Sequence, residues 1–374
     1  MIRPEEFREQ CAAKLLTLIG AASHLRAFIG LDGFVDEIIH AVDKRNSAEH
    51  FQRLPTISSL SERISAAAGR STNIELVNQR TKLGGNGPIM ANALARLGVK
   101  VTYVGALGYP VMHPVFNEFA SHADVHSIAE AGHTDAVEFE DGKIMLTKSA
   151  QLNDITWPNI QARFGRDRFV DIYTKADLIA FVNWTMIPYM SELWASLLEE
   201  CRPAPGGPRR TIFFDLADPE KRTPKDILRA LELVGQFEQY FNVILGLNEK
   251  EAYEISNVLG LSSKSRSRDQ LSLLVGDIQQ RIAISTLVVH PVAYALAVSE
   301  SVVSLVEGPY VDKPLITTGA GDHFNSGFCL GKLLGFDNAA SILLGVTTSG
   351  FYVRTAKSPA IEDLAQMLRH WPQN

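Results

Sequence analysis

A glycine-rich turn runs directly into an acidic residue in the stretch TTGAGDHF, where Asp322 follows Gly319 and Gly321. The apolar residues after it recur at helical spacing and predict a helix that begins near Asp322. Such a turn presents backbone N–H groups and the positive end of a helix dipole, which together form an anion site. Because a carboxylate repels an anion, we interpret Asp322 as a base that takes a proton from a hydroxyl beside a transferring phosphoryl group.

This stretch allows two other interpretations. Asp is a preferred N-cap residue, so Asp322 could simply cap the helix after a flexible turn. A dinucleotide-binding fingerprint would need a third glycine at position 324, where Phe324 stands, and would lie early in its unit rather than late in the chain. The residues alone do not decide whether Asp322 is an N-cap or a catalytic base, but they argue against a dinucleotide-binding site.

Apolar runs that alternate with helical patterns supply the framework for these residues. The strand-like runs lie at 26–31, 99–105, 176–184, 211–216 and 242–248, and the tract 285–300 indicates two more strands joined by a turn. Residues 1–24 are expected to form a helix, and 84–108 a loop, a helix and a strand. Continuous apolar strands between helices predict an α/β fold with a mostly parallel sheet that is covered on both faces.

A hairpin is expected at 136–148, outside that series of strands and helices. Asp141-Gly142 is a favoured two-residue turn, and folding about it pairs Phe139 with Ile144 and Val137 with Leu146. This apolar face could serve as a dimer contact or could cover a substrate. Residues 45–80 are polar and are expected to be helical.

Composition bounds the function further. The chain has 374 residues, of which 46% are hydrophobic and 21% charged, so a large core is expected. A net charge of −6 argues against a nucleic-acid partner. The three cysteines form no metal or redox motif, which fits a reducing cytosol. No apolar run is long enough to span a bilayer, and the acidic start does not resemble a signal peptide. A cytoplasmic protein without a membrane partner is therefore expected.

Five segments carry a resemblance to a known family, and they occur along the chain in that family's order. TTGAGDHF looks like the C-terminal signature of the ribokinase-like (PfkB-type) carbohydrate kinases, and GGNGPIMANALARLG is similar to their N-terminal signature. LDGFVDEI, FFDLADP and GLNEKEAYEI also resemble segments of that family. The resemblance covers roughly residues 26 to 356. It implies a three-layer α/β/α sandwich with a small β-sheet lid.

The resemblance implies a role for each matching residue. Asp322 is matched to the catalytic base, and the backbone of Gly319, Ala320 and Gly321 to the anion hole. Asn248 and Glu251 are matched to the Mg²⁺ segment, which acts through water; they also fit a helix capping box, and both roles can hold together. The acceptor site is implied to contain Asp32, Asp36, Gly84, Gly85 and Asn86. The nucleotide site is implied to contain Asn248, His290, Thr318, Gly319 and Gly321.

For several of these residues a structural explanation stays open. Asp32 or Asp36 could belong to a solvated turn, and the glycines could only close the turn before Pro88. His290 could be a structural histidine at a strand end.

The sequence departs from the family pattern at three places. Ile316 replaces the aspartate that helps to hold a monovalent cation, so strong K⁺ dependence is not expected. Ile89 replaces a second asparagine of the acceptor site. His290 lies in a strand end that normally lines the nucleotide, and Arg354 could contact the donor or lie on the surface.

The sequence therefore predicts an ATP- and Mg²⁺-dependent kinase that phosphorylates an alcohol of a sugar or a sugar-containing small molecule. The alternatives are a non-catalytic binding protein on the same fold and a nucleoside kinase of the same family. A single domain is expected over 1–374, with a helical extension at 1–25, a lid from about 33–43 and 133–156, and a nucleotide-binding part at about 240–360. A homodimer through the lid is a further expectation.

Overall fold

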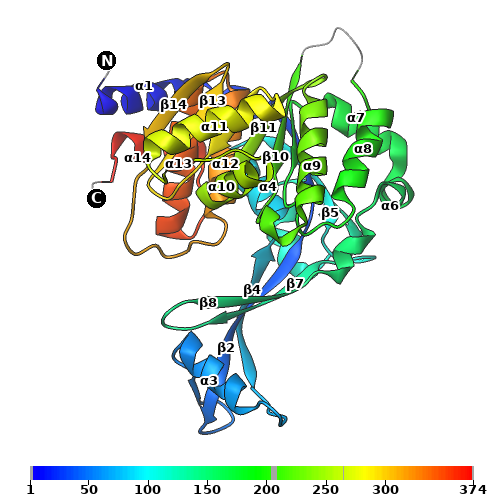
Figure 1. Cartoon of the computed structure of the whole chain (residues 1–374), viewed down its shortest axis with the longest axis vertical. Coiled ribbons are helices and arrows are strands. Elements are labelled where there is room, and N and C mark those ends of the chain that lie inside the picture. The colour runs from blue at the N-terminus through cyan, green and yellow to red at the C-terminus, as the bar shows by residue number, and fades with distance from the viewer. Residues whose placement is uncertain (1–2, 204–208, 264, 373–374) are drawn as a thin grey trace.

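The computed structural model describes residues 3–203, 209–263 and 265–372. It has two parts, a layered body and a long arm of strands that projects from it (Figure 1). None of the helices in the described ranges combines the length and the hydropathy that crossing a bilayer requires.

A nine-stranded sheet forms the centre of the body, in the order β14-β13-β12-β11-β10-β9-β1-β5-β6. The strands from β12 to β6 pair in parallel, whereas β13 and β14 add antiparallel at one edge. Their bounds are β1 Arg26–Leu31, β5 Lys100–Ala106, β6 Asp124–Ala129, β9 Leu178–Phe181, β10 Arg210–Asp215, β11 Phe241–Leu247, β12 Thr286–Val289, β13 Tyr294–Ser299 and β14 Val302–Glu307. The predicted strands are confirmed, but β6 and β14 were not predicted.

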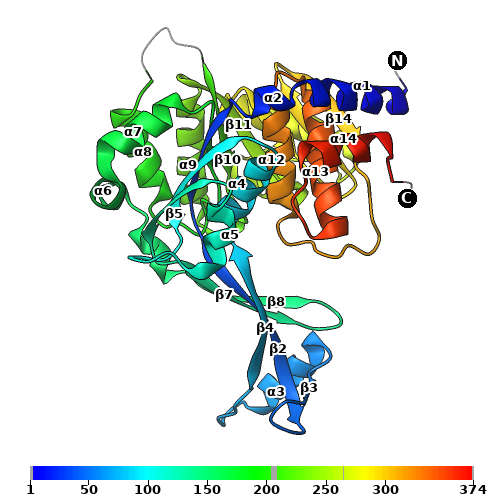
Figure 2. The same ribbon diagram turned by 180° about the vertical axis from the view of Figure 1, so that it is seen from behind.

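Helices cover both faces of this sheet. Side chains alternate between the two faces, so Phe28 of β1 enters one hydrophobic core and Ile29 the other. One face is covered by α6 Trp157–Ile160, α7 Arg166–Lys175, α8 Met190–Glu200, α9 Pro224–Phe237, α10 Glu249–Val258 and α11 Arg268–Ile282. The other is covered by α1 Pro4–Thr17, α2 Ile19–Ala22, α4 Asn86–Arg96, α5 Asn117–Ala120, α12 Ala320–Leu333, α13 Asn338–Thr355 and α14 Ile361–Arg369. The predicted three-layer α/β/α sandwich is confirmed, and Figure 2 shows the termini close together at α1 and α14.

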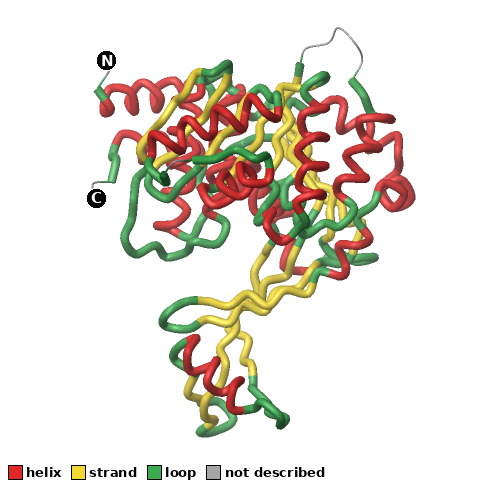
Figure 3. The backbone as a smooth tube through the Cα atoms, in the orientation of Figure 1, coloured by secondary structure: helices red, strands yellow, loops and turns green. Residues whose placement is uncertain are grey.

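The arm is a five-stranded lid sheet with one helix at its tip (Figure 3). Its elements are β2 Phe34–Arg45, β3 Phe51–Arg53, α3 Ile57–Ala66, β4 Leu76–Gly84, β7 Gly132–Glu138 and β8 Lys143–Lys148. The expectation of helix over 45–80 is wrong for β3 and β4. Most residues of β4 lie at the surface, so this strand lacks the alternation of apolar and polar residues that marks a half-buried strand.

The hairpin between β7 and β8 exists, but its register differs from the prediction. Val137 pairs with Ile144 and Glu138 with Lys143, so the loop contains four residues rather than two. Asp141 accepts a hydrogen bond from the Ile57 N–H at 2.9 Å, and Phe139 is buried in a small core with residues of the lid tip. The loop between β7 and β8 is therefore held by contacts with the lid tip and not by a tight two-residue turn.

The apolar face that suggested a dimer is covered mainly within the chain. Val137 and Phe139 are buried in the core of the lid tip, and Ile144 packs against it, whereas Leu146 is exposed. A homodimer through the lid stays a prediction, and this face gives it less support than the sequence suggested.

Candidate active site

The GAGD stretch forms the first turn of α12, which begins at Ala320, two residues before the predicted start. Gly319 takes the N-cap position with φ of 90°, a left-handed conformation that suits glycine. Asp322 is therefore the third helical residue, and the interpretation of Asp322 as an N-cap is wrong.

The Asp322 side chain is buried rather than capping the helix. Its Oδ1 accepts a hydrogen bond from the Asn86 Nδ2 at 3.0 Å, so the two predicted signatures meet here. Burial raises the pKa of Asp322 to about 8, against the lowering effect of the Asn86 hydrogen bond. A carboxyl group with such a pKa is suited to exchange a proton near neutral pH.

The N–H groups of this turn differ in their availability. The Ala320 N–H donates to the Thr317 carbonyl at 3.1 Å, so it is already used within the turn. Within the described residues, the N–H groups of Gly319 and Gly321 have no such acceptor. Both residues line a cavity of about 510 Å³ that also contains Asp322. These two N–H groups are therefore the ones that can hold an anion.

A second, smaller cavity of about 210 Å³ lies between the body and the lid. Asp322 and Gly319 line it from the body, and Asp36 and Thr134 line it from the lid. Asp36 is buried, which raises its pKa, while Lys82 and a hydrogen bond from Thr134 lower it. This cavity thus brings the predicted base and the predicted acceptor-binding carboxylate to one space.

The glycine at position 84 leaves room for the Asp36 carboxylate in its present position. A Cβ at Gly84 would lie 2.3 Å from the Asp36 Oδ1. Gly85 has φ of 96° and forms the N-cap of α4, which also positions Asn86. The predicted glycines therefore shape this wall of the cavity through close approach and backbone conformation.

Asp32 has a different environment from Asp36. Its Oδ2 accepts hydrogen bonds from the Asn86 N–H at 2.9 Å and from the Asn183 Nδ2 at 2.7 Å, and its Oδ1 accepts from the Gly87 N–H at 2.8 Å. Asp32 is completely buried, and these hydrogen bonds hold the start of α4 in place. The prediction that it grips the acceptor is not supported by these contacts.

Asn183 is a site residue that the sequence reasoning missed. It follows β9, has φ of 60° and lines the smaller cavity beside Asp36. Its Oδ1 is buried and has no partner within the described residues, although buried polar atoms normally find one. Its position after the carboxyl end of a parallel strand was the available signal, because ligands bind at that edge.

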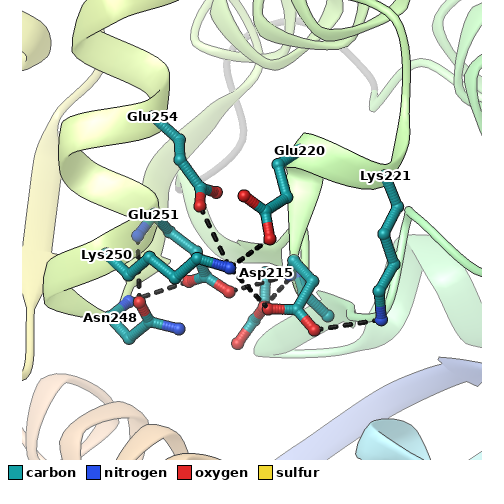
Figure 4. Close-up of polar contacts among 9 residues, drawn as sticks. Asp215, Glu220, Lys221, Asn248, Lys250, Glu251 and Glu254 are labelled. Atoms are coloured by element: carbon teal, nitrogen blue, oxygen red, sulfur yellow. Dashed lines mark hydrogen bonds and ion pairs between the residues drawn. The ribbon is translucent and has the colours of Figure 1, made fainter.

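Four carboxylates surround the larger cavity, from Asp215, Asp218, Glu251 and Asp322. Glu251 and Asn248 form the predicted capping box of α10, and Glu251 Oε1 also accepts the Asp218 N–H at 2.9 Å. Figure 4 shows Asn248, Glu251 and Asp215 beside Lys250, which pairs with Glu220, Glu254 and Asp218.

Asp215 was not among the predicted site residues, although its segment was. Burial raises its pKa, and the nearby charges of Glu251 and Asp322 raise it further. Its oxygens accept hydrogen bonds from the Ala217 N–H at 2.9 Å and the Asn325 Nδ2 at 2.8 Å. Carboxylates that destabilise one another's charge fit a divalent cation, which prefers oxygen ligands.

A mainly apolar pocket of about 410 Å³ continues from the larger cavity. Both spaces are lined by Asn248, His290 and Gly321. His290 packs on Phe324 with ring centroids 4.7 Å apart, and burial lowers its pKa to about 4, so it is neutral at physiological pH. Arg354 instead donates to the carbonyls of Gly350 and Tyr310 and supports this wall.

Comparisons with known proteins agree with this geometry. A family model described as prokaryotic ketohexokinase matches residues 8–371. A ketohexokinase of Haloferax volcanii is 31% identical over 341 residues, which are 91% of this chain and 89% of the relative. The resemblance to ribokinase-like carbohydrate kinases is thereby confirmed.

Solved structures confirm the fold. The nucleoside kinase of Methanocaldococcus jannaschii superposes with a TM-score of 0.62 at 14% identity and covers 92% of this chain and 98% of its own. A ribokinase of Arabidopsis thaliana, solved with ribose and ATP, gives a TM-score of 0.62 at 16% identity, with the same coverage. At this identity the likeness shows the ribokinase fold alone.

Proposed function

The chain belongs to the prokaryotic ketohexokinase family, and we propose that it transfers the γ-phosphoryl group of ATP to a hydroxyl of a ketohexose. That it is a carbohydrate kinase follows from the family. The donor, the acceptor and the role of Asp322 as base are the proposal. One observation carries it: Asp322 lines both the acid-rich cavity and the smaller cavity closed by the lid.

The acceptor binds in the smaller cavity between the body and the lid. Asp36 and the unpartnered Asn183 Oδ1 accept hydrogen bonds from sugar hydroxyls there. A volume of about 210 Å³ lies below the usual range for drug-sized ligands. It therefore favours a single sugar over a nucleoside, the alternative acceptor within this fold.

The donor binds across the larger cavity and the apolar pocket. The adenine ring of ATP packs between the pocket walls near His290 and Phe324, and the phosphates lie over the N–H groups of Gly319 and Gly321. Asn248, Glu251 and Asp215 would hold Mg²⁺, directly or through water, and the ion would neutralise phosphate charge.

Asp322 takes the proton of the acceptor hydroxyl as the phosphoryl group is transferred. The lid contributes by excluding water, because Met145 and Thr147 of β8 line the acceptor cavity. Lys143 of the lid also lies 3.5 Å from the Thr318 hydroxyl, beside the anion-binding turn. Turnover depends on Mg²⁺ but not strongly on K⁺, in line with Ile316, and occurs in the cytoplasm, where ATP is available.

The test is ADP release from Mg-ATP with separate acceptors. Ketohexoses such as fructose and tagatose are compared with aldohexoses, ribose and adenosine. Turnover that is at least about tenfold faster with a ketohexose supports the assignment. Preference for adenosine would select the nucleoside kinase instead, and no turnover with any acceptor would reject the proposal.

A further inference from the structure

A separate cavity of about 570 Å³ lies behind the anion-binding turn, outside the spaces assigned to the donor and the acceptor. It is lined by β4, by α4, by α5 and the turn before it, by the first turn of α12, and by the end of α13 with the residues that follow. Apart from Lys82, which acts on Asp36, its charged groups have no part in the proposed reaction.

The charges around this cavity are mainly positive. Lys82, Arg96 and Lys357 line it, and within the described residues none of them lies within 4.0 Å of a carboxylate oxygen. Lys82 also acts at longer range on Asp36, whose pKa it lowers, whereas Arg96 and Lys357 have no such partner among the described groups. Glu118 is the one acidic residue among the described lining residues. Unpaired cations around a concave space attract an anion, and arginine in particular suits phosphate.

Polar neutral groups accompany these cations. Asn92 lines the cavity, and its buried Oδ1 has no partner within the described residues. Thr81 and Ser358 contribute hydroxyl groups. A ligand that combines a phosphate with several hydroxyls would match this lining better than a simple inorganic anion.

The wall between this cavity and the anion-binding turn is made of two aromatic residues. The His323 Nδ1 lies 2.7 Å from the Gly319 carbonyl, and its Nε2 lies 2.9 Å from the Ser358 hydroxyl. The His323 ring stacks on Tyr352 at 3.6 Å, and the Tyr352 hydroxyl donates to the Thr318 carbonyl at 3.0 Å. Both carbonyls belong to the turn that holds the phosphoryl group, so a ligand against this wall can shift that turn.

Ile89 forms a second link between the two sides. It lines both this cavity and the acceptor cavity. A Cβ at Gly319 would lie 3.2 Å from the Ile89 Cγ2, so Ile89 lies next to the turn at this residue.

We propose that this cavity binds a small phosphorylated sugar and that its occupancy changes the turnover of the kinase. The binding part stands on the cavity itself, whereas the effect on turnover rests on the proposed function. Arg96 and Lys357 are exposed and lie outside the proposed catalytic groups, so they can be changed without disturbing the core.

Binding is measured by calorimetry with the whole protein and three probes: fructose 6-phosphate, inorganic phosphate and fructose. The double variant Arg96→Ala/Lys357→Ala is compared with Lys225→Ala, which removes an exposed charge from α9. We expect the dissociation constant for fructose 6-phosphate to rise at least about tenfold in the double variant and to stay unchanged in the control. Because a phosphate bound in the active site would be unaffected by the double change, this loss assigns the binding to the cavity.

Several results would overturn the proposal. Absent binding, or equal affinity in the double variant, would reject the site. Equally tight binding of inorganic phosphate would reject the preference for a sugar phosphate. If turnover at saturating substrates shows no response that the double variant abolishes, the regulatory part fails. Since the calorimetry needs no turnover, failure of the site and failure of the proposed kinase reaction can be told apart.

Discussion

Asp32, after β1, and Asp322, at the start of α12, are both buried carboxylates beside a helix N-terminus, but their surroundings differ. Asp32 accepts two backbone N–H groups and the Asn183 amide, whereas Asp322 accepts one side-chain amide and lines two cavities. Burial raises the pKa of Asp32 to about 6, with hydrogen bonds lowering it, and raises that of Asp322 to about 8. Hydrogen bonds that saturate a carboxylate make it structural, and their scarcity leaves it available as a base.

The largest effect is expected from a change of Asp322, the proposed base. Asp322→Asn should lower kcat by about 10²–10⁴-fold, because no group remains to take the proton. Burial favours the protonated carboxyl in the folded protein, so ionisation above the unfolded pKa costs stability. The melting temperature of the variant at pH 9 should therefore not fall below that of the unchanged protein. Steady-state kinetics and thermal unfolding check this; near-full turnover would contradict the assignment of the base.

A change of Asp32 should have the opposite result, with a larger loss of stability and a smaller loss of turnover. Asp32→Ala leaves the N–H groups of Asn86 and Gly87 and the Asn183 amide without their acceptor, which should cost about 2–3 kcal/mol of unfolding free energy. The control is Asp337→Ala, which removes the N-cap of α13 and should cost only about 1 kcal/mol. Denaturant unfolding measures both. A fall in kcat as deep as that of Asp322→Asn, with stability kept, would show that Asp32 is catalytic.

The pH profile tests the same contrast without a mutation. The base must be ionised, and the Asp322 pKa is raised to about 8. We therefore expect kcat/KM to rise with pH, about tenfold per unit below pH 8, and to level off above it. Initial rates over pH 5.5–9.5 give the profile. If the profile instead levels off near pH 6, the pKa of Asp32, the two roles would be reversed.

A smaller effect should appear at Asn183, which donates to Asp32 and also lines the proposed acceptor cavity. Asn183→Ala should raise the KM for the sugar about tenfold, with a smaller change in kcat, because one hydroxyl loses its acceptor. The KM for ATP serves as the internal control and should not change. An equal rise in the KM for the sugar and the KM for ATP would show a general distortion of the site rather than the loss of one contact to the sugar.

The sequence predicted the helix start at Asp322 to within two residues, the parallel strands and the capping box of Asn248 and Glu251. These features depend on local patterns of glycine, apolar periodicity and helix caps. The hydrogen bonds of Asp32 could not be predicted, because its partners lie 54, 55 and 151 residues away. Asn183 and Asp215 were missed for the same reason, since each joins the site only through the order of the strands.

The chain leaves and re-enters the lid tip at neighbouring points. The Val42 N–H donates to the Glu75 carbonyl at 2.9 Å, and Arg45 forms an ion pair with Glu75, so the ends of segment 46–75 are held side by side. We therefore expect that a short turn or a reporter domain can replace the tip, with the loss of β3 and α3, while β2 and β4 keep their pairing. The replacement must supply new apolar contacts for Phe139, which would otherwise be exposed to solvent.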